Sequence, residues 1–176
     1  TSETGTVYPY RVRWGKIDSL VDMDEVTANQ SGYRDLESAG GPIQRMIGGT
    51  YITVYQQSTI QVGQYIGAPA IWKFDVVEKQ RGCGRQPYSV IPLGRLHLYR
   101  AEDGFFIFDG LESHAIGDQK INKYFADNAD ASAFNRMVSA YDAANQVAMW
   151  GFVTTSSADG NPDRIMLYHI PSGWWA

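Results

Sequence analysis

The sequence predicts an all-β fold made of β-propeller-like blades, each with four antiparallel strands. Short runs of β-branched and aromatic residues, separated by turns that contain Gly or Pro, occupy most of the 176 residues. The runs form three similar series, whose second strands at Ile52, Leu96 and Val147 lie 44 and 51 residues apart. This period, with four short strands per unit, is typical of a propeller blade.

Apolar residues on both faces of single strands are the third observation. In residues 104–108, for example, four of the five residues are Phe or Ile. A sheet with one face in water would alternate apolar and polar residues, so we expect these sheets to be covered on both faces by neighbouring blades. A single β-sandwich is the alternative, although its outer faces are usually polar.

Residues 7–41 are predicted to form an incomplete first blade. They contain one strand, Val7–Trp14, that has no partner upstream, followed by turns punctuated by Gly. A single turn of helix at Tyr33–Glu37 is a further expectation. Because three blades do not close a ring, we expect the chain to be a fragment of a longer propeller-containing protein.

The rest of the chain is predicted to form three blades, so that residues 1–176 are a single propeller-type region. The blades are expected at roughly 42–79, 87–121 and 136–176. Their predicted strands are 51–55, 59–65 and 70–77, then 88–91, 95–99, 104–108 and 115–116, and finally 136–141, 147–153, 164–170 and 174–175. A short helix at Asn128–Met137, capped by Asp127 or Asp130, would connect the second and third blades.

Composition excludes several classes of protein. With 15 basic and 19 acidic residues the net charge is −4, which argues against a general binder of nucleic acid or of anionic membranes. The single cysteine excludes an internal disulfide framework and a Cys-based zinc site. No run approaches the ~18 apolar residues of a membrane span, so we expect no membrane insertion by this segment.

No motif of the sequence predicts a catalytic, cofactor-binding or metal site, and we expect a protein that is not an enzyme and has no cofactor. The three histidines, His97, His114 and His169, are too far apart to suggest a local metal motif. Cys83 lies between Arg81 and Arg85, which would lower a thiol pKa, but an inert thiol in a flexible loop is the favoured interpretation.

Two kinds of chemistry depend on acidic residues, namely calcium binding and glycoside hydrolysis. The run Asp18, Asp22, Asp24, Glu25 lacks the sixth-position Gly of an EF-hand and is predicted to be a solvated loop. A glycosidase needs two carboxylates about 5 to 9.5 Å apart. Nothing in the sequence pairs the candidates, which are Asp75, Glu78, Asp103, Asp109 and Glu112.

Two further patterns relate to saccharides. Residues 157–161 approach a sialidase-type Asp box, but the Gly falls one place early and no Trp follows, so a hairpin loop is the better interpretation. Large aromatic side chains that would stack on saccharides or contact proteins are Tyr8, Tyr10, Trp72, Trp174 and Trp175. We expect most of them to be core residues.

Four sequence segments resemble those of a known family. They are Arg11–Asp18, the stretch from Gly40-Gly41-Pro42-Ile43 to Ile60-Gln61-Val62, the stretch from Asp103 to Gly110 with Ile116–Ile121 running on to Phe125, and the pair 137–150 and 165–175. In these segments the chain resembles the tail-hub and nozzle proteins of short-tailed bacteriophages and related phage virion proteins. Gly15 stands where those proteins usually have Ser.

The resemblance implies a structural function without catalytic residues. Such proteins form six-fold rings below the portal and its adaptor, surround the channel through which genomic DNA leaves without sequence-specific binding, and anchor tail fibres or spikes. The implied location is the virion tail, and the host cytoplasm during assembly. We expect loops 80–86 and 154–163 to contact partners, because they project from sheet edges.

Two other functions stay open at this point. One is a carbohydrate-binding or glycan-cleaving propeller that acts in receptor recognition. The other is a cellular propeller that serves as an interaction platform. A propeller fold is compatible with all three functions, because fold does not fix function.

Overall fold

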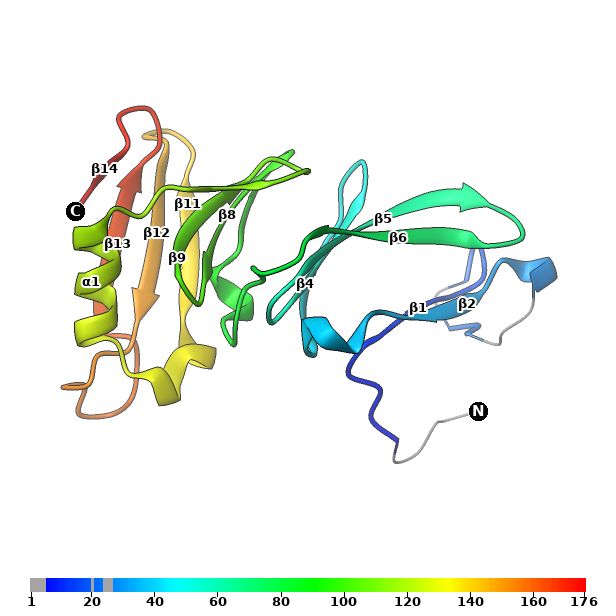
Figure 1. The fold of residues 1–176 in the computed structure, drawn as a ribbon, viewed down its shortest axis with the longest axis horizontal. Helices are drawn as coiled ribbons and strands as arrows, with labels where there is room; N and C mark the ends of the chain where they lie inside the picture. The colour runs from blue at the N-terminus through cyan, green and yellow to red at the C-terminus, as the bar shows by residue number, and fades with distance from the viewer. Residues whose placement is uncertain (1–5, 20, 24–26) are drawn as a thin grey trace.

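The computed structural model describes residues 6–19, 21–23 and 27–176. In this part of the chain, fourteen strands form four antiparallel sheets, and none of the sheets closes on itself (Figure 1). The prediction of a mostly β chain of antiparallel strands is therefore confirmed. None of the described helices is long and apolar enough to cross a membrane.

Each sheet is a meander in which neighbouring strands are consecutive in the sequence. The N-terminal sheet pairs β1 (Arg11–Trp14) with β2 (Gly32–Asp35). The first four-stranded sheet contains β3 (Ile43–Ile47), β4 (Ile52–Gln56), β5 (Ile60–Gly67) and β6 (Ile71–Glu78). The second contains β7 (Ile91–Leu93), β8 (Leu96–Ala101), β9 (Gly104–Phe108) and β10 (Ser113–Ala115), and the third contains β11 (Val138–Asp142), β12 (Val147–Phe152), β13 (Arg164–His169) and β14 (Trp174–Trp175).

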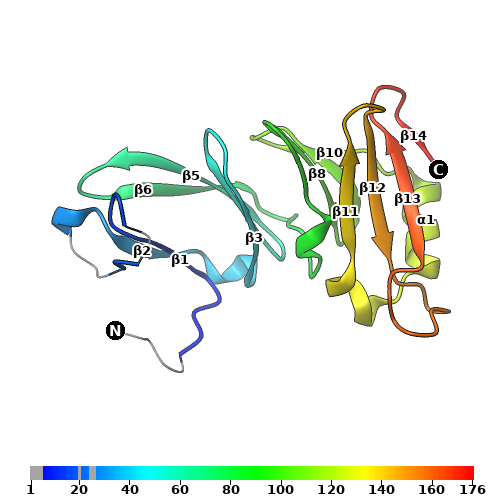
Figure 2. The ribbon, with the colours of Figure 1, turned by 180° about the vertical axis from the view of Figure 1, so that it is seen from behind.

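The three four-stranded sheets follow one another in sequence order along the long axis of the molecule, and the β1–β2 sheet lies alongside β5 and β6, as Figures 1 and 2 both show. A hydrophobic cluster lies between each sheet and the next. Val12 and Leu36 of the N-terminal part meet Val54 of β4. Tyr55 of β4 and Ile60 of β5 pack with aromatic residues of the second sheet, and a third cluster joins the second and third sheets. Both faces of the two middle sheets are therefore covered.

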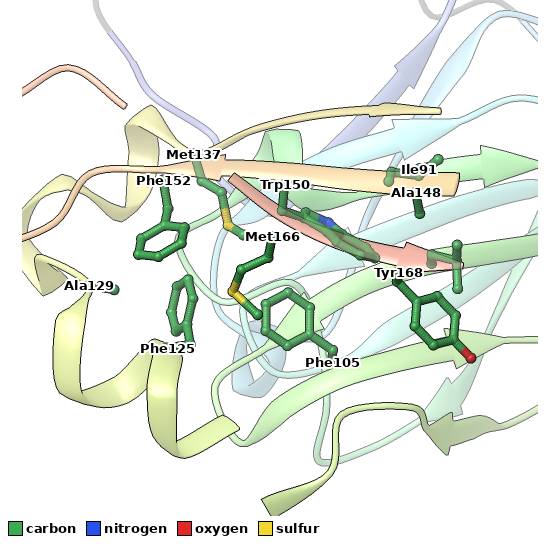
Figure 3. Close-up of a cluster of buried hydrophobic side chains, with 11 residues drawn as sticks. Ile91, Phe105, Phe125, Ala129, Met137, Ala148, Trp150, Phe152, Met166 and Tyr168 are labelled. Carbon is green, nitrogen blue, oxygen red and sulfur yellow. The ribbon is translucent and has the colours of Figure 1, made fainter. Parts of the chain in front are cut away.

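The cluster between the second and third sheets is rich in aromatic rings (Figure 3). The Phe105 ring lies 5.1 Å from both the Trp150 and the Trp175 rings, measured between centroids, and 5.6 Å from Phe125. The buried Trp150 indole donates a hydrogen bond to the carbonyl oxygen of Ser89 at 2.8 Å. Full burial of one such ring stabilises the fold by about 1.5–3 kcal/mol, so this cluster fixes the two sheets against each other.

The helix between the second and third sheets begins earlier than predicted. Helix α1 spans Gln119–Asn128, and Asp118 caps it by accepting a hydrogen bond from the Ile121 amide at 2.8 Å. The expected helix at 128–137 is a 3-10 helix, η4 (Ala131–Arg136), capped by Asp130. The position of α1 follows from Ile121 and Phe125, which lie four residues apart on one face and pack into the core.

Two other predicted elements are corrected. Residues 32–35 form β2, not a turn of helix, because this segment is the partner that β1 needed. The expected strand at 88–91 is mostly the 3-10 helix η3 (Pro87–Ser89), and β7 begins at Ile91. The remaining 3-10 helices are η1 (Thr27–Asn29) and η2 (Ser38–Gly40).

Candidate functional site

The outer face of the third sheet is apolar and uncovered among the described residues. The strand register places the members of this terminal face in three rows: Val138, Gly151 and Ile165, then Ala140, Met149 and Leu167, then Val147 and Trp174 together with the polar Asp142 and His169. Ile165 is 66% exposed and Trp174 is 78% exposed. In Figure 2 strands β11, β12 and β13 lie in front, with α1 on their far side.

The opposite end of the stack carries aromatic and charged side chains. There, the two strands β1 and β2 lie on a four-stranded sheet, and Tyr65 of that sheet stays 52% exposed. Arg11 lies over the rings of Tyr8 and Tyr33 at 3.9 and 3.8 Å and forms an ion pair with Asp35 at 2.7 Å. The two ends of the stack therefore present different surfaces, one apolar and one aromatic and charged.

A cavity of about 670 Å³ opens between the first and second four-stranded sheets. We call it the inter-sheet cleft. Turns from both sheets surround it: Gly48–Tyr51 between β3 and β4, Gly94–Arg95 between β7 and β8, and Gly110–Leu111 between β9 and β10. Thr53, Val62, Pro92 and His97 of the strands complete the lining, and of these Thr53 and His97 are buried. The cleft is the open end of the interface whose other part is packed around Tyr55.

His97 at the base of this cleft is 4% exposed and is hydrogen-bonded through Nδ1 to the Tyr55 hydroxyl at 3.0 Å. Burial, with a smaller effect from Arg45, lowers the pKa of His97 and favours the neutral ring. Burial also raises the pKa of Tyr55 well above its ordinary value, so the phenol stays protonated. The sequence contains no metal motif at His97, and no motif in it links this residue to a cavity.

Three ionisable groups in the turn after β9 lie close together. Single ligand atoms of Asp109, Glu112 and His114 are within 4.8 Å of one another. Asp109 already accepts hydrogen bonds from the amides of Leu111 and Glu112 at 2.8 and 3.0 Å, and these bonds are the main reason that its pKa is lowered. The group is exposed, and its hydrogen bonds describe a capped turn. The sequence signal for this group is the spacing of Asp109, Glu112 and His114, which lie within six residues of one another.

The other candidate carboxylates are not paired with each other. Asp75 forms an ion pair with Lys73 at 2.8 Å, and Asp103 forms one with Arg81 at 2.8 Å. Of the acids considered for glycoside chemistry, the structure brings Asp109 and Glu112 together in the turn after β9. Asp24 and Glu25 of the acidic run lie outside the described residues.

Cys83 corrects the expectation of a flexible loop. Its side chain is fully buried, and its amide donates to the Gln56 carbonyl at 3.1 Å, while the Gly84 amide donates to the Gln57 carbonyl at 3.0 Å. Burial raises the pKa of the thiol to about 12, so the flanking arginines do not activate it. The predicted inert thiol is thus packed against β4 instead of lying in a mobile segment.

The remaining candidates have local structural roles. His169 Nδ1 lies 2.6 Å from the Ser172 hydroxyl in the turn before β14. Asp159 accepts a hydrogen bond from the Asn161 amide at 3.0 Å, which agrees with a hairpin loop between β12 and β13. Trp175 packs in the core, but Trp174 is exposed on the terminal face. Tyr8 is exposed, and Tyr10 and Trp72 are half-buried, so the expectation that most of these aromatic residues are core residues is wrong.

No known protein family matches this chain, and a search of curated proteins finds no match either.

Proposed function

We propose that this chain is a structural, non-enzymatic component of a bacteriophage tail, in a hub or nozzle ring below the portal and its adaptor. The observation that supports this function best is the uncovered terminal face at the end of a stack in which the middle sheets are covered on both faces. An apolar patch of this kind is typical of an interaction surface. The sequence resemblance to tail-hub and nozzle proteins supplies the location in the virion.

This proposal includes a more specific fold, in which the sheets are propeller blades arranged around an axis. In a propeller the first strands of neighbouring blades lie close together near the axis. Here β7 contacts β11, and β3 contacts η3, which immediately precedes β7. Arg45 on β3 also donates to the Pro87 carbonyl of η3 at 3.0 Å. These contacts favour blades over a single sandwich.

We infer that a second copy of the chain covers the terminal face. A closed ring needs a heterologous contact, in which one patch meets a different patch on the next subunit. The apolar terminal face and the aromatic, charged end around Tyr33 and Tyr65 are two such patches on one chain. Six copies would form the ring, with genomic DNA passing through it and with the adaptor and the fibres or spikes as further partners.

Negative-stain imaging of the native-length polypeptide tests this proposal. We expect six-fold rings with a central hole wide enough for DNA. The double variant Ile165→Lys with Leu167→Lys places two charges on the terminal face and should abolish the rings while the far-UV circular dichroism stays unchanged. Tyr124→Lys is the matched control, because Tyr124 is 41% exposed on α1, away from that face.

Two results would refute the proposal. Rings of the double variant that match the wild type would show that the terminal face is not the contact. Solitary particles of the wild-type protein at every concentration, also in the presence of the adaptor, would refute the ring itself. Charge reversal at Arg81 and Arg85 examines loop 80–86 separately, and unchanged assembly there would remove this loop from the interface.

A further inference from the structure

The inter-sheet cleft has a buried hydrogen-bond donor at its base. The Tyr55 hydroxyl has no partner among the described residues other than His97 Nδ1, so its proton is best placed in that bond. Nδ1 is then the acceptor, and the neutral ring carries its hydrogen on Nε2. Nε2 is then the ring nitrogen that remains for another partner, and His97 is one of the residues that line the cavity. Nε2 is not among the buried atoms that lack a partner.

A second polar group lies beside this donor. Thr53 of β4 is 7% exposed and lines the same cavity. Its hydroxyl has no hydrogen-bond partner in the described part of the chain and, like His97 Nε2, is not a fully enclosed atom. Neither group has a protein partner among the described residues, so both are open to hydrogen bonds with a polar ligand in the cavity that they line.

The rim adds one positive charge and one aromatic ring. Arg95 is exposed in the turn between β7 and β8, where Gly94 with a φ of 70° permits the tight reversal. Among the described residues it forms no ion pair. Tyr51 on the opposite turn is 51% exposed and offers a flat ring face. A ligand in the cleft would therefore meet hydrogen-bonding groups, one cation and one aromatic ring among the lining residues.

We propose that the inter-sheet cleft binds a saccharide that carries a carboxylate. Arg95 would pair with the carboxylate, Thr53 and His97 Nε2 would hydrogen-bond sugar oxygens, and Tyr51 would pack on the sugar ring. The volume of about 670 Å³ lies in the range of about 300–1,000 Å³ that is typical of small-molecule sites. This inference does not depend on ring assembly.

The geometry disfavours two other ligand classes. A peptide that adds a strand pairs with the backbone of an edge strand, and of the edge strands beside the cleft β7 contributes only Pro92, which has no amide hydrogen to donate, to the lining. A nucleotide phosphate usually meets several cationic groups or a helix N-terminus. Here a single arginine lines the cavity, which fits the single charge of a sugar carboxylate.

Ligand titrations followed by two-dimensional NMR of the labelled chain test the proposal. The probes are methyl β-D-glucuronide and the methyl glycoside of N-acetylneuraminic acid as two sources of an acidic sugar. Methyl β-D-glucoside lacks the carboxylate, sodium acetate lacks the sugar, and an acidic peptide represents the other macromolecular class. We expect saturable binding of at least one acidic sugar, with shifts centred on Thr53 and His97. The neutral glucoside should bind at least about tenfold more weakly than the acidic sugar.

Two variants and a control separate the roles of the groups. Arg95→Gln should weaken the acidic sugar about tenfold and leave the weak binding of the glucoside unchanged, because only the charge-assisted contact is lost. Thr53→Val keeps the shape of the side chain and should weaken both sugars. Arg85→Gln removes an exposed arginine that does not line the cleft and should bind like the wild type.

Each other outcome would overturn the proposal. Failure of both acidic sugars to bind saturably would exclude this ligand class. Equal binding of acetate and the glucuronide would mean that the site recognises only an anion. Competition by the acidic peptide at equal concentration would assign the cleft to a protein partner. Unchanged affinity of Arg95→Gln with the wild-type shift pattern would remove Arg95 from the site.

Discussion

Replacement of Phe105 by Ala is the most direct test of the packing between the second and third sheets. Phe105 lies on β9, is 1% exposed, and contacts rings from three other elements: Phe125 on α1, Trp150 on β12 and Trp175 on β14. Truncation removes the transferred apolar area and leaves a cavity that these rigid rings fill only in part. Such changes cost about 3–5 kcal/mol of unfolding free energy. For a chain of this length that corresponds to a fall in melting temperature of roughly 6–20 °C.

Urea unfolding followed by tryptophan fluorescence measures this cost, because Trp150 and Trp175 report on the same cluster. Far-UV circular dichroism gives a second, backbone-based transition. Ile165→Ala is the control: Ile165 lies on the terminal face and is 66% exposed, so the isolated chain should lose little stability. A loss below about 1.5 kcal/mol for Phe105→Ala would mean that the two sheets do not share a cooperative core, and our account of the stack would be wrong.

Three further predictions concern the first and second sheets. Gly82→Ala should lower stability by about 1–3 kcal/mol in urea unfolding, because a Cβ there would overlap the Gln56 carbonyl oxygen; wild-type stability would contradict the packed loop. Cys83, with its thiol pKa raised to about 12, should react with a thiol reagent at pH 8 at least about a thousandfold more slowly than in urea, and equal rates would show that the loop opens freely. Because the pKa of His97 is lowered in the folded state, the imidazole is protonated at a higher pH in the unfolded chain than in the folded one, so the free energy of unfolding should fall as the pH drops below about 6.5. His97→Gln should reduce this dependence of the unfolding free energy on pH, and an unchanged dependence would refute the buried, neutral state of His97.

Runs of β-branched and aromatic residues, bounded by turn residues, predicted correctly the strands that lie between two other strands of a sheet. The runs around Thr53, Val62 and Phe106 each became a central strand of a four-stranded sheet. Prediction failed where a long-range contact decides the local structure. The segment before Ile91 reads as a strand, but its turn is fixed by the Trp150 indole, which bonds to the Ser89 carbonyl from 61 residues away.

The helix error has a different cause. Ala content favoured residues 128–137, whereas the Asp118 cap and the spacing of Ile121 and Phe125 were visible in the sequence and point to α1. The inter-sheet cleft was beyond sequence reasoning, since its lining comes from turns of two sheets and no motif links Thr53 to His97. Its only sequence signal is the repeated Gly at the strand turns, which many loops share.

The meander order of the sheets has a consequence for how the chain is made. Every four-stranded sheet is complete once its own contiguous segment has been synthesised, and each hydrophobic cluster joins sheets that are consecutive in the sequence. We therefore expect folding on the ribosome to proceed from the N-terminus one sheet at a time, without waiting for distant strands. At each stage the newest sheet would expose its apolar outer face until the next sheet emerges, so chaperone binding should be strongest when the chain has left the ribosome as far as residue 78 or residue 115.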